Sequence, residues 1–298
     1  MILQFLALIM LGQLALFAVI QAIVVGIYAR YMRPESTTES MSSTDTCAVL
    51  MSLRGADANL RQTLLAHLQQ RDITYHLHWI VDSEHDPAVE IIRQLPLEFI
   101  DRWTLHILEL NSDRCSLKCL GLSQVARKLL MKTSPPQYFA FADGDGLVSF
   151  DWLRRLLNPM VKQRDSETAS IGATTGHRWY TCFPRIVSLE TASDSANKPK
   201  KNQPVSPGAV VRYFWNLGSL PQMHLFRVVW GGSWAIRSDV LRNSGLLESW
   251  EQSMFEDTQV RRFVETMGHR VVTAPGVLVQ SHEPMSLSAA THWISRQL

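Results

Sequence analysis

The stretch FAFADGDGLV, residues 139–148, decides the fold of this chain. It begins as an apolar run with the character of a buried strand, and it ends in Asp143 and Asp145. Mg²⁺ and Mn²⁺ prefer oxygen ligands and usually share their coordination sphere with substrate phosphates. A pair of carboxylates at the end of a strand therefore suggests a metal site for chemistry on a nucleotide diphosphate.

Three other interpretations compete for the two aspartates. A calcium loop of the EF-hand kind, counted from Asp143, fails because Val148 stands where the turn needs Gly and Arg154 where a bidentate Glu belongs. A phosphatase nucleophile of the aspartyl-phosphate type would need a partner Lys and more carboxylates, which the sequence does not place. The third interpretation is a plain turn, because Asp and Gly favour turns for purely local reasons. The segment by itself does not exclude such a turn.

The segments around this stretch alternate between strand and helix patterns, with Pro and Gly at the breaks. Strands are predicted at 47–53, 76–82, 103–110 and 138–143, with a further short strand before GHRWY (176–180), and helices at 60–70, 87–95, 116–131, 152–160 and 258–268. Such alternation predicts an α/β fold, with a mostly parallel sheet flanked by helices and ligands at the carboxyl ends of the strands. Arg54, Asp82 and Asp145 follow three of these strands, so we expect them to share that edge.

The N-terminus predicts a membrane anchor. Residues 1–29 carry no charge and are mostly Leu, Ile, Val, Ala and Phe, and a bilayer is crossed by roughly 20 such residues as a helix. Arg30 and Arg33 follow, as on a cytoplasmic flank. A cleaved signal peptide would have a basic start and a small-residue cleavage site, and a core helix would have a polar face. We expect one uncleaved transmembrane helix, with the catalytic domain in the cytoplasm.

Composition indicates the domain organisation, the class of partner and the redox compartment. Residues 30–46 are polar and rich in Ser and Thr, which is typical of a linker, and residues 47–298 are enough for one large domain. A net charge of +2, from 29 basic and 27 acidic residues, with no basic and aromatic cluster, argues against a nucleic-acid partner. The four cysteines lack metal-ligand spacing and form no disulfide framework, which fits a reducing compartment.

Two short motifs in the second half add candidate site residues. Gly231 and Gly232 lie between aromatic residues in VVWGGSWAIR, where the backbone can approach a sugar closely; a tight turn is the other interpretation. Glu256 and Asp257 precede a predicted helix. They are either charges at a helix N-terminus or the source of a general base, and the sequence leaves both open.

Taken together, these motifs resemble a known family. LRGADANL, VDSEHDPAVEI, CSLKCLGL, DGDGLVSFDWLRRL, WGGSWAIR and FEDTQV occur in the order found in family 2 glycosyltransferases. From Cys47 onward the chain is similar to this family, in particular to its ceramide glucosyltransferase-like branch. The resemblance implies the GT-A fold, a Rossmann-like sheet.

The resemblance also implies roles for single residues. Asp82 would contact the uracil of a UDP-sugar, and the rest of the nucleotide-sugar pocket would be Arg54, Gly55, Lys118, Asp143, Gly231 and Gly232. Asp143 and Asp145 would hold Mg²⁺ or Mn²⁺ on the diphosphate and so stabilise the leaving UDP. Asp257 would be the general base for the acceptor hydroxyl, supported by Glu256.

The chain departs from the family pattern near its end. Members of this branch continue through a Q-x-x-R-W motif into interfacial and membrane helices, and Gln297 matches the first residue of that motif. We expect the C-terminal membrane part to be absent from this chain. Gln297 is either a residue on the acceptor and diphosphate side or an incidental terminal residue, and His282 is either an additional metal contact or a surface residue.

The sequence and the resemblance together lead to one expected function. It is a membrane-anchored, metal-dependent, inverting transfer of a hexose, glucose first, from a UDP-sugar to a hydroxyl of a lipid acceptor. The apolar segment 212–226 would either lie at the membrane interface or pack in the core. The alternatives are a polysaccharide-forming glycosyltransferase and a truncated, non-catalytic nucleotide-sugar-binding relative.

Overall fold

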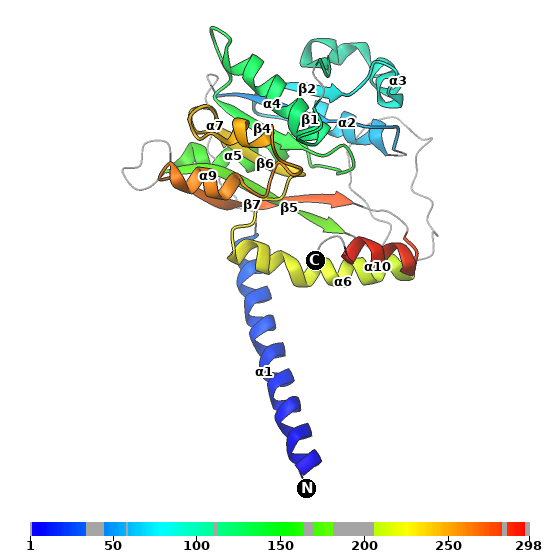
Figure 1. Cartoon of the computed structure of the whole chain (residues 1–298), viewed down its shortest axis with the longest axis vertical. Coiled ribbons are helices and arrows are strands. Elements are labelled where there is room, and N and C mark those ends of the chain that lie inside the picture. Colours follow the sequence, from blue (N-terminus) through cyan, green and yellow to red (C-terminus); the bar gives the residue numbers. More distant parts are fainter. Residues whose placement is uncertain are drawn as a thin grey trace.

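The computed structural model describes residues 2–33, 45–57, 59–109, 112–163, 170–180, 206–281 and 285–295. Their centre is a seven-stranded sheet in the order β3-β2-β1-β4-β6-β5-β7 (Figure 1). The strands are β1 (Thr46–Ser52), β2 (Thr74–Val81), β3 (Trp103–Ile107), β4 (Tyr138–Ala142), β5 (Ile171–Tyr180), β6 (Ser233–Arg237) and β7 (Arg270–Ser281). All neighbours pair in parallel except β6, which runs antiparallel to both β4 and β5.

Helices cover both faces of this sheet, as the apolar strands require. One face packs on α2 (Leu60–Leu68), α3 (Pro87–Arg93) and α5 (Trp152–Lys162). The other packs on α4 (Leu117–Leu130), α7 (Ser238–Asn243), α8 (Leu246–Trp250) and α9 (Val260–Thr266). A 3₁₀ helix, Leu97–Arg102, leads into β3. The predicted α/β sheet flanked by helices is confirmed.

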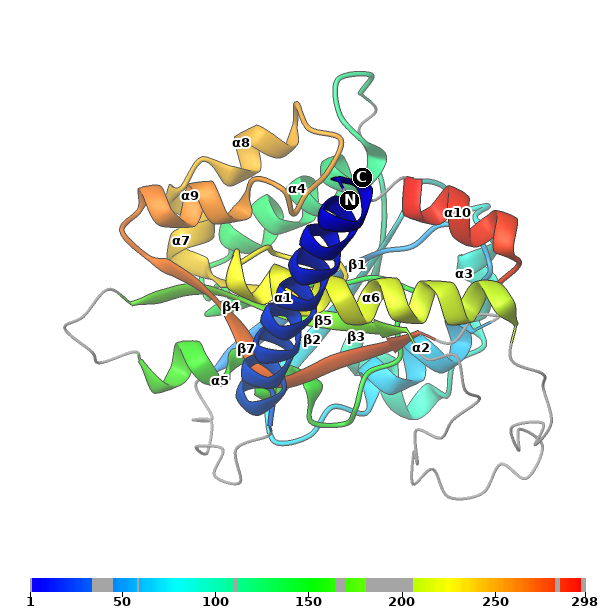
Figure 2. The same ribbon diagram turned by 90° about the horizontal axis from the view of Figure 1, so that it is seen from below.

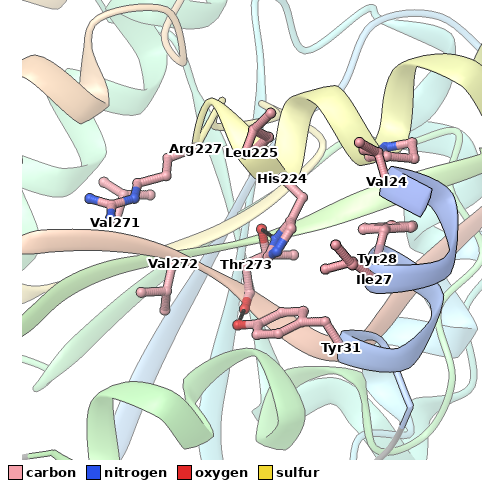
Figure 3. Close-up of a pocket in the computed structure, with 11 residues that line it drawn as sticks. Val24, Ile27, Tyr28, Tyr31, His224, Leu225, Arg227, Val271, Val272 and Thr273 are labelled. Atoms are coloured by element: carbon pink, nitrogen blue, oxygen red, sulfur yellow. Dashed lines mark hydrogen bonds between the residues drawn. The ribbon is translucent and has the colours of Figure 1, made fainter. Parts of the chain in front are cut away.

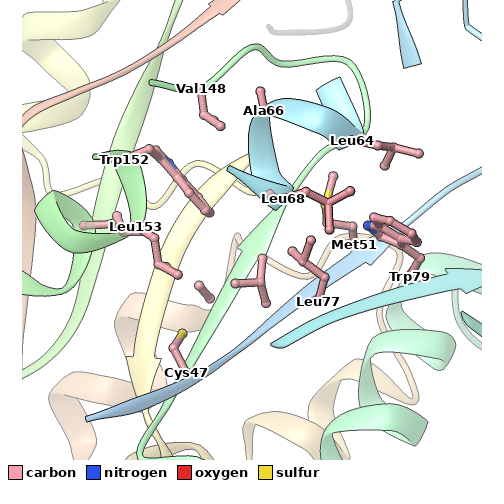
Figure 4. Packing of buried hydrophobic residues seen from close by; sticks show 14 of the residues in the cluster. Cys47, Met51, Leu64, Ala66, Leu68, Leu77, Trp79, Val148, Trp152 and Leu153 are labelled. Carbon is pink, nitrogen blue, oxygen red and sulfur yellow. The ribbon is translucent and has the colours of Figure 1, made fainter. Parts of the chain in front are cut away.

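The central strand β1 shows why the two faces form. Val49 and Met51 point into one core with Leu64 and Trp152, whereas Ala48 and Leu50 point into the other. A strand buried on both faces reads as a continuous apolar run, and this is how CAVLM reads in the sequence. Figure 4 shows the first of these cores, in which Met51, Leu68, Leu77 and Trp79 pack together.

Helix starts follow local capping chemistry. The Asp86 side chain accepts from the Ala88 backbone N–H at the start of α3, with Pro87 in the first turn. The Ser116 side chain accepts from the Cys119 N–H at the start of α4. One predicted boundary is wrong: GHRWY is the second half of β5 and not a segment after a short strand, because it pairs in register with Leu278–Ser281 of β7.

The N-terminal helix α1 (Ile2–Tyr31) projects away from the sheet (Figure 1). Among the described residues it is the one helix long and apolar enough to cross a membrane, and its apolar window is not buried in the structure. The helix α6 (Pro207–Leu225) meets the C-terminal end of α1, and α10 (Leu287–Ser295) lies beside the other end of α6 (Figures 1 and 2).

Candidate active site

One edge of the sheet collects the candidate residues. Because β1, β2 and β4 are parallel, the residues that follow them emerge at the same edge: Arg54, Gly55, Asp82, Asp143 and Asp145. The antiparallel β6 begins at this edge, which brings in Gly231 and Gly232. Gly144 lies against Leu53, where an added Cβ would be 2.8 Å from Cδ2, so the aspartate turn touches the end of β1.

Lys118 joins two of the predicted carboxylates. Its Nζ donates to Asp143 Oδ1 at 2.8 Å and also contacts Glu256 Oε1. Burial opposes the charge of Lys118, but the two carboxylates outweigh it and raise the lysine pKa. Burial likewise tends to raise the pKa of Asp143, yet Lys118 and then Arg178 hold it below its usual range. Asp143 and Glu256 are thus joined by one half-buried cation, although they lie on different elements.

The two glycines hold the acidic pair at the edge. The Gly231 backbone N–H donates to Asp257 Oδ2 at 2.8 Å. A Cβ at Gly231 would lie 2.3 Å from Glu256 Oε1 and 2.9 Å from Asp257 Oδ2, and one at Gly232 would lie 2.7 Å from Asp143 Oδ2. Only glycine allows the backbone to approach three carboxylates this closely.

Asp257 has the ionisation expected of a base. Burial raises its pKa and the charge of Glu256 adds to the rise, while the bond from Gly231 works in the opposite direction. A carboxylate with a raised pKa is a stronger base than an exposed one and is better matched to accept a proton near neutral pH. In this geometry Glu256 is bound to Lys118, which leaves Asp257 as the better placed base.

Asp145 is paired with a residue that the sequence analysis missed. Arg178, near the end of β5, donates from Nη2 to Asp145 Oδ1. The Arg178 guanidinium lies 5.1 Å from the ring centre of Trp230 and 5.4 Å from that of Tyr180, and the arginine side chain is only 14% exposed. Asp143 and Asp145 therefore each contact a cationic side chain, Lys118 and Arg178 respectively.

The loop that carries the two aspartates is also held through its backbone. The backbones of Leu147 and Gln280 exchange two hydrogen bonds, at 2.8 and 2.9 Å, so this loop is bound to the end of β7.

The other end of the edge holds the residues expected for the nucleotide base. Arg54 Nε lies 3.6 Å from Asp82 Oδ2, but the arginine side chain is 80% exposed and the pair contributes little stability. Gly55 has a φ of +75° and donates its N–H to both carboxylate oxygens of Asp86, at 3.0 and 3.1 Å. Asp86 is the second residue that sequence reasoning missed as part of the site.

Asp143 and Asp145 fit as two ligands of a hard divalent cation. Both carboxylates are partly exposed, at 30% and 40%, and each uses Oδ1 for its lysine or arginine partner. Diphosphate and water oxygens would complete such a sphere. In the part of the chain that the structure describes, no three His, Cys, Asp or Glu side chains gather as a metal site. The candidates His282 and Gln297 lie outside the described residues.

Faint sequence signals existed for the two missed residues. Asp86 stands directly before Pro87, a pattern typical of a helix N-cap, but the pattern does not tell that the carboxylate also reaches Gly55. Arg178 stands between His177 and Trp179 in an apolar strand, where an unpaired charge is costly and a partner is to be expected. That partner lies 33 residues away.

Comparison with known proteins found one family model and several solved structures. The family model described as Glycosyl transferase family 21 matches residues 11–128. The mannosyltransferase PcManGT from Pyrobaculum calidifontis, solved with GDP-Man and Mn²⁺, has a TM-score of 0.51 at 16% identity over 95% of this chain and 71% of that one. Glucosyl-3-phosphoglycerate synthase from Mycobacterium tuberculosis has a TM-score of 0.46 at 11% identity over 89% and 82%. No curated protein sequence matches the chain.

These findings support different parts of the resemblance. The similarity to the mannosyltransferase shows the fold, and the family match covers α1 to α4, which includes Arg54, Asp82 and Lys118 but not the aspartate loop. The chain has the GT-A fold, and the match to glycosyl transferase family 21 indicates a glycosyltransferase.

Proposed function

We propose that the chain is a membrane-anchored, inverting glycosyltransferase that moves a hexose, glucose first, from a UDP-sugar to a hydroxyl of a lipid acceptor. The observation that carries the proposal is the group formed by Asp143, Lys118, Glu256 and Asp257 at one edge of a GT-A sheet. In this group, Lys118 would offset the charge of the diphosphate and Asp257 would act as the general base.

The proposed division of labour follows the contacts. Asp82 and Gly55 would bind the base, and the charges of Lys118 and Arg178 would offset diphosphate oxygens. A bound Mg²⁺ or Mn²⁺ would neutralise charge on the departing UDP, and the Mn²⁺ in the P. calidifontis mannosyltransferase supports this requirement.

In the proposed reaction, Asp257 takes the acceptor proton. As the acceptor oxygen forms its bond to the anomeric carbon, the bond from that carbon to the diphosphate oxygen breaks and UDP leaves with the electron pair. The acceptor proton goes to Asp257. One displacement inverts the anomeric configuration, so a UDP-α-sugar gives a β-linked product.

Apolar surface near the base favours a lipid acceptor. Met254 and Phe255 directly precede the acidic pair, and each is 65% exposed. On α6, Phe214 is 64% exposed and Leu225 63%, although Arg212 and Asn216 of the same helix are buried. One side of the segment 212–226 packs in the protein, and we propose that its exposed side lies at the membrane interface. A transmembrane α1 would hold this surface at the bilayer, with the sheet in the cytoplasm.

A product analysis tests the proposal. Membranes containing the chain would be incubated with labelled UDP-glucose and Mn²⁺, and the label traced into extracted lipids. A β-linked glycolipid is expected. Label found only in the polymer fraction would replace the lipid acceptor with a growing polysaccharide, and UDP binding without any product would identify a non-catalytic binder. Resistance of the chain to carbonate extraction tests the anchor separately.

The Gly231→Ala variant tests the packing of the acidic pair. Its methyl group would overlap Glu256 Oε1, as the 2.3 Å approach requires, and displace both carboxylates. We expect transfer to fall about 100-fold, since a displacement of about 1 Å at a reacting group has that effect. Gly218→Ala is the matched control, because a Cβ there meets nothing within 4 Å. Initial rates and thermal melts of both variants decide the matter; a normal rate for Gly231→Ala would contradict the assigned geometry.

The Arg178→Gln variant tests the cation beside Asp145. Removal of this charge takes away a competitor for the carboxylate, so we expect the affinity for free Mn²⁺ to rise about tenfold, as charge interactions at a partly buried site allow. Affinity for UDP in the presence of the metal should fall. Electron paramagnetic resonance of free Mn²⁺ and calorimetry with UDP measure the two effects, and Arg178→Lys should stay close to the parent protein. Unchanged or weaker Mn²⁺ binding in Arg178→Gln would refute the competition.

A further inference from the structure

A cavity lies where α1 meets the domain. It has a volume of about 330 Å³ and opens between the C-terminal ends of α1 and α6 and the first residues of β7 (Figure 3). Residues from these three elements line it, among them Val24, Ile27, Tyr31, His224, Arg227 and Thr273. The cavity is therefore built at the junction of the apolar helix with the sheet.

The lining has an apolar and a polar side. Ile27 and Leu225 are 61% and 63% exposed and offer hydrocarbon surface. Opposite them, the Tyr31 hydroxyl donates to Thr273 O at 2.6 Å, and His224 Nδ1 lies 3.0 Å from Thr273 Oγ1. Figure 3 shows these polar side chains converging between the two helices. A ligand that fits must itself be amphiphilic.

Arg227 supplies the charge of this cavity. Its side chain is 47% exposed, and Nη1 lies 3.9 Å from Glu265 Oε1, at the outer limit of an ion pair. Its backbone has a φ of +52°, in the left-handed region that usually holds glycine at the end of a helix. An arginine in this strained position is unusual, and strained residues gather at ligand sites. The positive charge suits an anionic ligand.

The position of the cavity relative to the membrane indicates which kind of amphiphile it binds. This inference rests on the proposed anchoring of the chain by α1. Tyr28 and Tyr31 near the end of a transmembrane helix, with Arg30 between them, are residues of the membrane interface. The cavity that they border then lies at the level of lipid headgroups, with Val24 and Ile27 toward the hydrocarbon.

The cavity lies close to the elements that carry the candidate site. Thr273 pairs with Thr175 of β5. The Thr175 hydroxyl accepts a hydrogen bond from the Trp230 N–H at 3.1 Å, and Trp230 directly precedes Gly231. A lipid bound in the cavity would therefore lie beside the strands that position the site.

We propose that this cavity binds one anionic membrane phospholipid. Its phosphate accepts hydrogen bonds from Arg227, and its acyl chains run along Val24 and Ile27 of α1. A guanidinium suits a phosphate because its N–H groups form a planar fork. Such a lipid would fill the junction and fix the angle of the domain relative to the bilayer.

Native mass spectrometry of the full chain with added phosphatidylglycerol tests the proposal. Arg227→Asn removes the charge and keeps a residue that tolerates the left-handed backbone, and Ile27→Trp fills the apolar side. Each is expected to weaken phosphatidylglycerol binding about tenfold, as the loss of one charge-assisted bond implies. Arg262→Gln removes an exposed charge from α9, outside this cavity, and should bind as the parent does. Arg227→Lys should restore part of the affinity.

Two comparisons separate the possible failures. Equal retention of phosphatidylglycerol by the parent, Arg227→Asn and Ile27→Trp would overturn the lipid site, as would its displacement by millimolar inorganic phosphate. Flotation of the parent chain with phosphatidylcholine vesicles tests α1 by itself; a chain that does not float would overturn the anchoring on which the site depends. Circular dichroism melts show whether each variant is folded.

Discussion

Replacing Asp257 by Asn is expected to lower the rate of sugar transfer about 10³-fold, within the range for loss of a general base, while UDP binding stays nearly intact. The amide keeps the shape of the side chain and its oxygen can still accept the Gly231 N–H, which is 2.8 Å from Oδ2 in the parent. It cannot accept a proton from the acceptor. Single-turnover rates and calorimetry with UDP separate the two effects.

Asp239→Asn is the matched control for this experiment. Asp239 is also an aspartate with a local partner, Arg237, but it lies after β6, at the opposite end of that strand from Gly231. Its rate should be that of the parent. A normal rate for Asp257→Asn would mean that Asp257 is not the base.

The pH dependence gives an independent check on Asp257. Transfer needs the ionised carboxylate, so the rate falls as the pH drops through the pKa of this group. Burial and the neighbouring Glu256 raise that pKa, so the acidic limb of the rate profile should lie at higher pH than for an exposed aspartate. A limb at or below the usual aspartate range would contradict the assignment.

Replacing Asp145 by Asn is expected to abolish metal-dependent UDP binding, with a loss of Mn²⁺ affinity of about 100-fold, the upper range for altering groups at a metal site. The carboxamide is a poorer ligand for a hard cation, and Arg178 loses its anionic partner and becomes an uncompensated charge beside the site. Titration of Mn²⁺ followed by UDP calorimetry measures both losses.

The double variant Asp145→Asn with Arg178→Gln separates metal binding from folding. It removes both members of the ion pair, so it should melt closer to the parent than Asp145→Asn does, yet it should still fail to bind Mn²⁺ tightly. Tight Mn²⁺ binding by Asp145→Asn would show that the metal, if required, is held elsewhere.

Much of the fold could be predicted because it depends on local patterns. The buried strands β1 and β4 are apolar runs, and α3 and α4 begin at Asp and Ser caps and pack apolar faces on the sheet. The error at GHRWY has a physical cause. The segment mixes Gly, His and Arg with aromatic residues, so nothing in the sequence indicates its pairing with β7, which decides that it is a strand.

The candidate site could be predicted only as separate pieces. The positions of Asp82 and Asp143 follow from parallel strands that end at one edge. Their partners do not follow, because Lys118 and Asp143 are 25 residues apart, Gly231 and Asp257 are 26 apart, and Asp145 and Arg178 are 33 apart. A charge in the sequence does not tell which opposite charge it will meet.

By itself, the sequence determined the strands β1 to β4, the helices α2 to α5 between and after them, the apolar N-terminal helix and the edge where Asp143 and Asp145 emerge. These depend on hydrophobic periodicity and strand direction, which are local properties of the chain. The tertiary structure alone decided that Lys118 and Arg178 neutralise the carboxylates, that Gly231 holds Asp257, and that Arg227 faces a cavity beside α1. Such contacts join residues far apart in the sequence, and buried charges select their partners only after the packing of the sheet has brought them together.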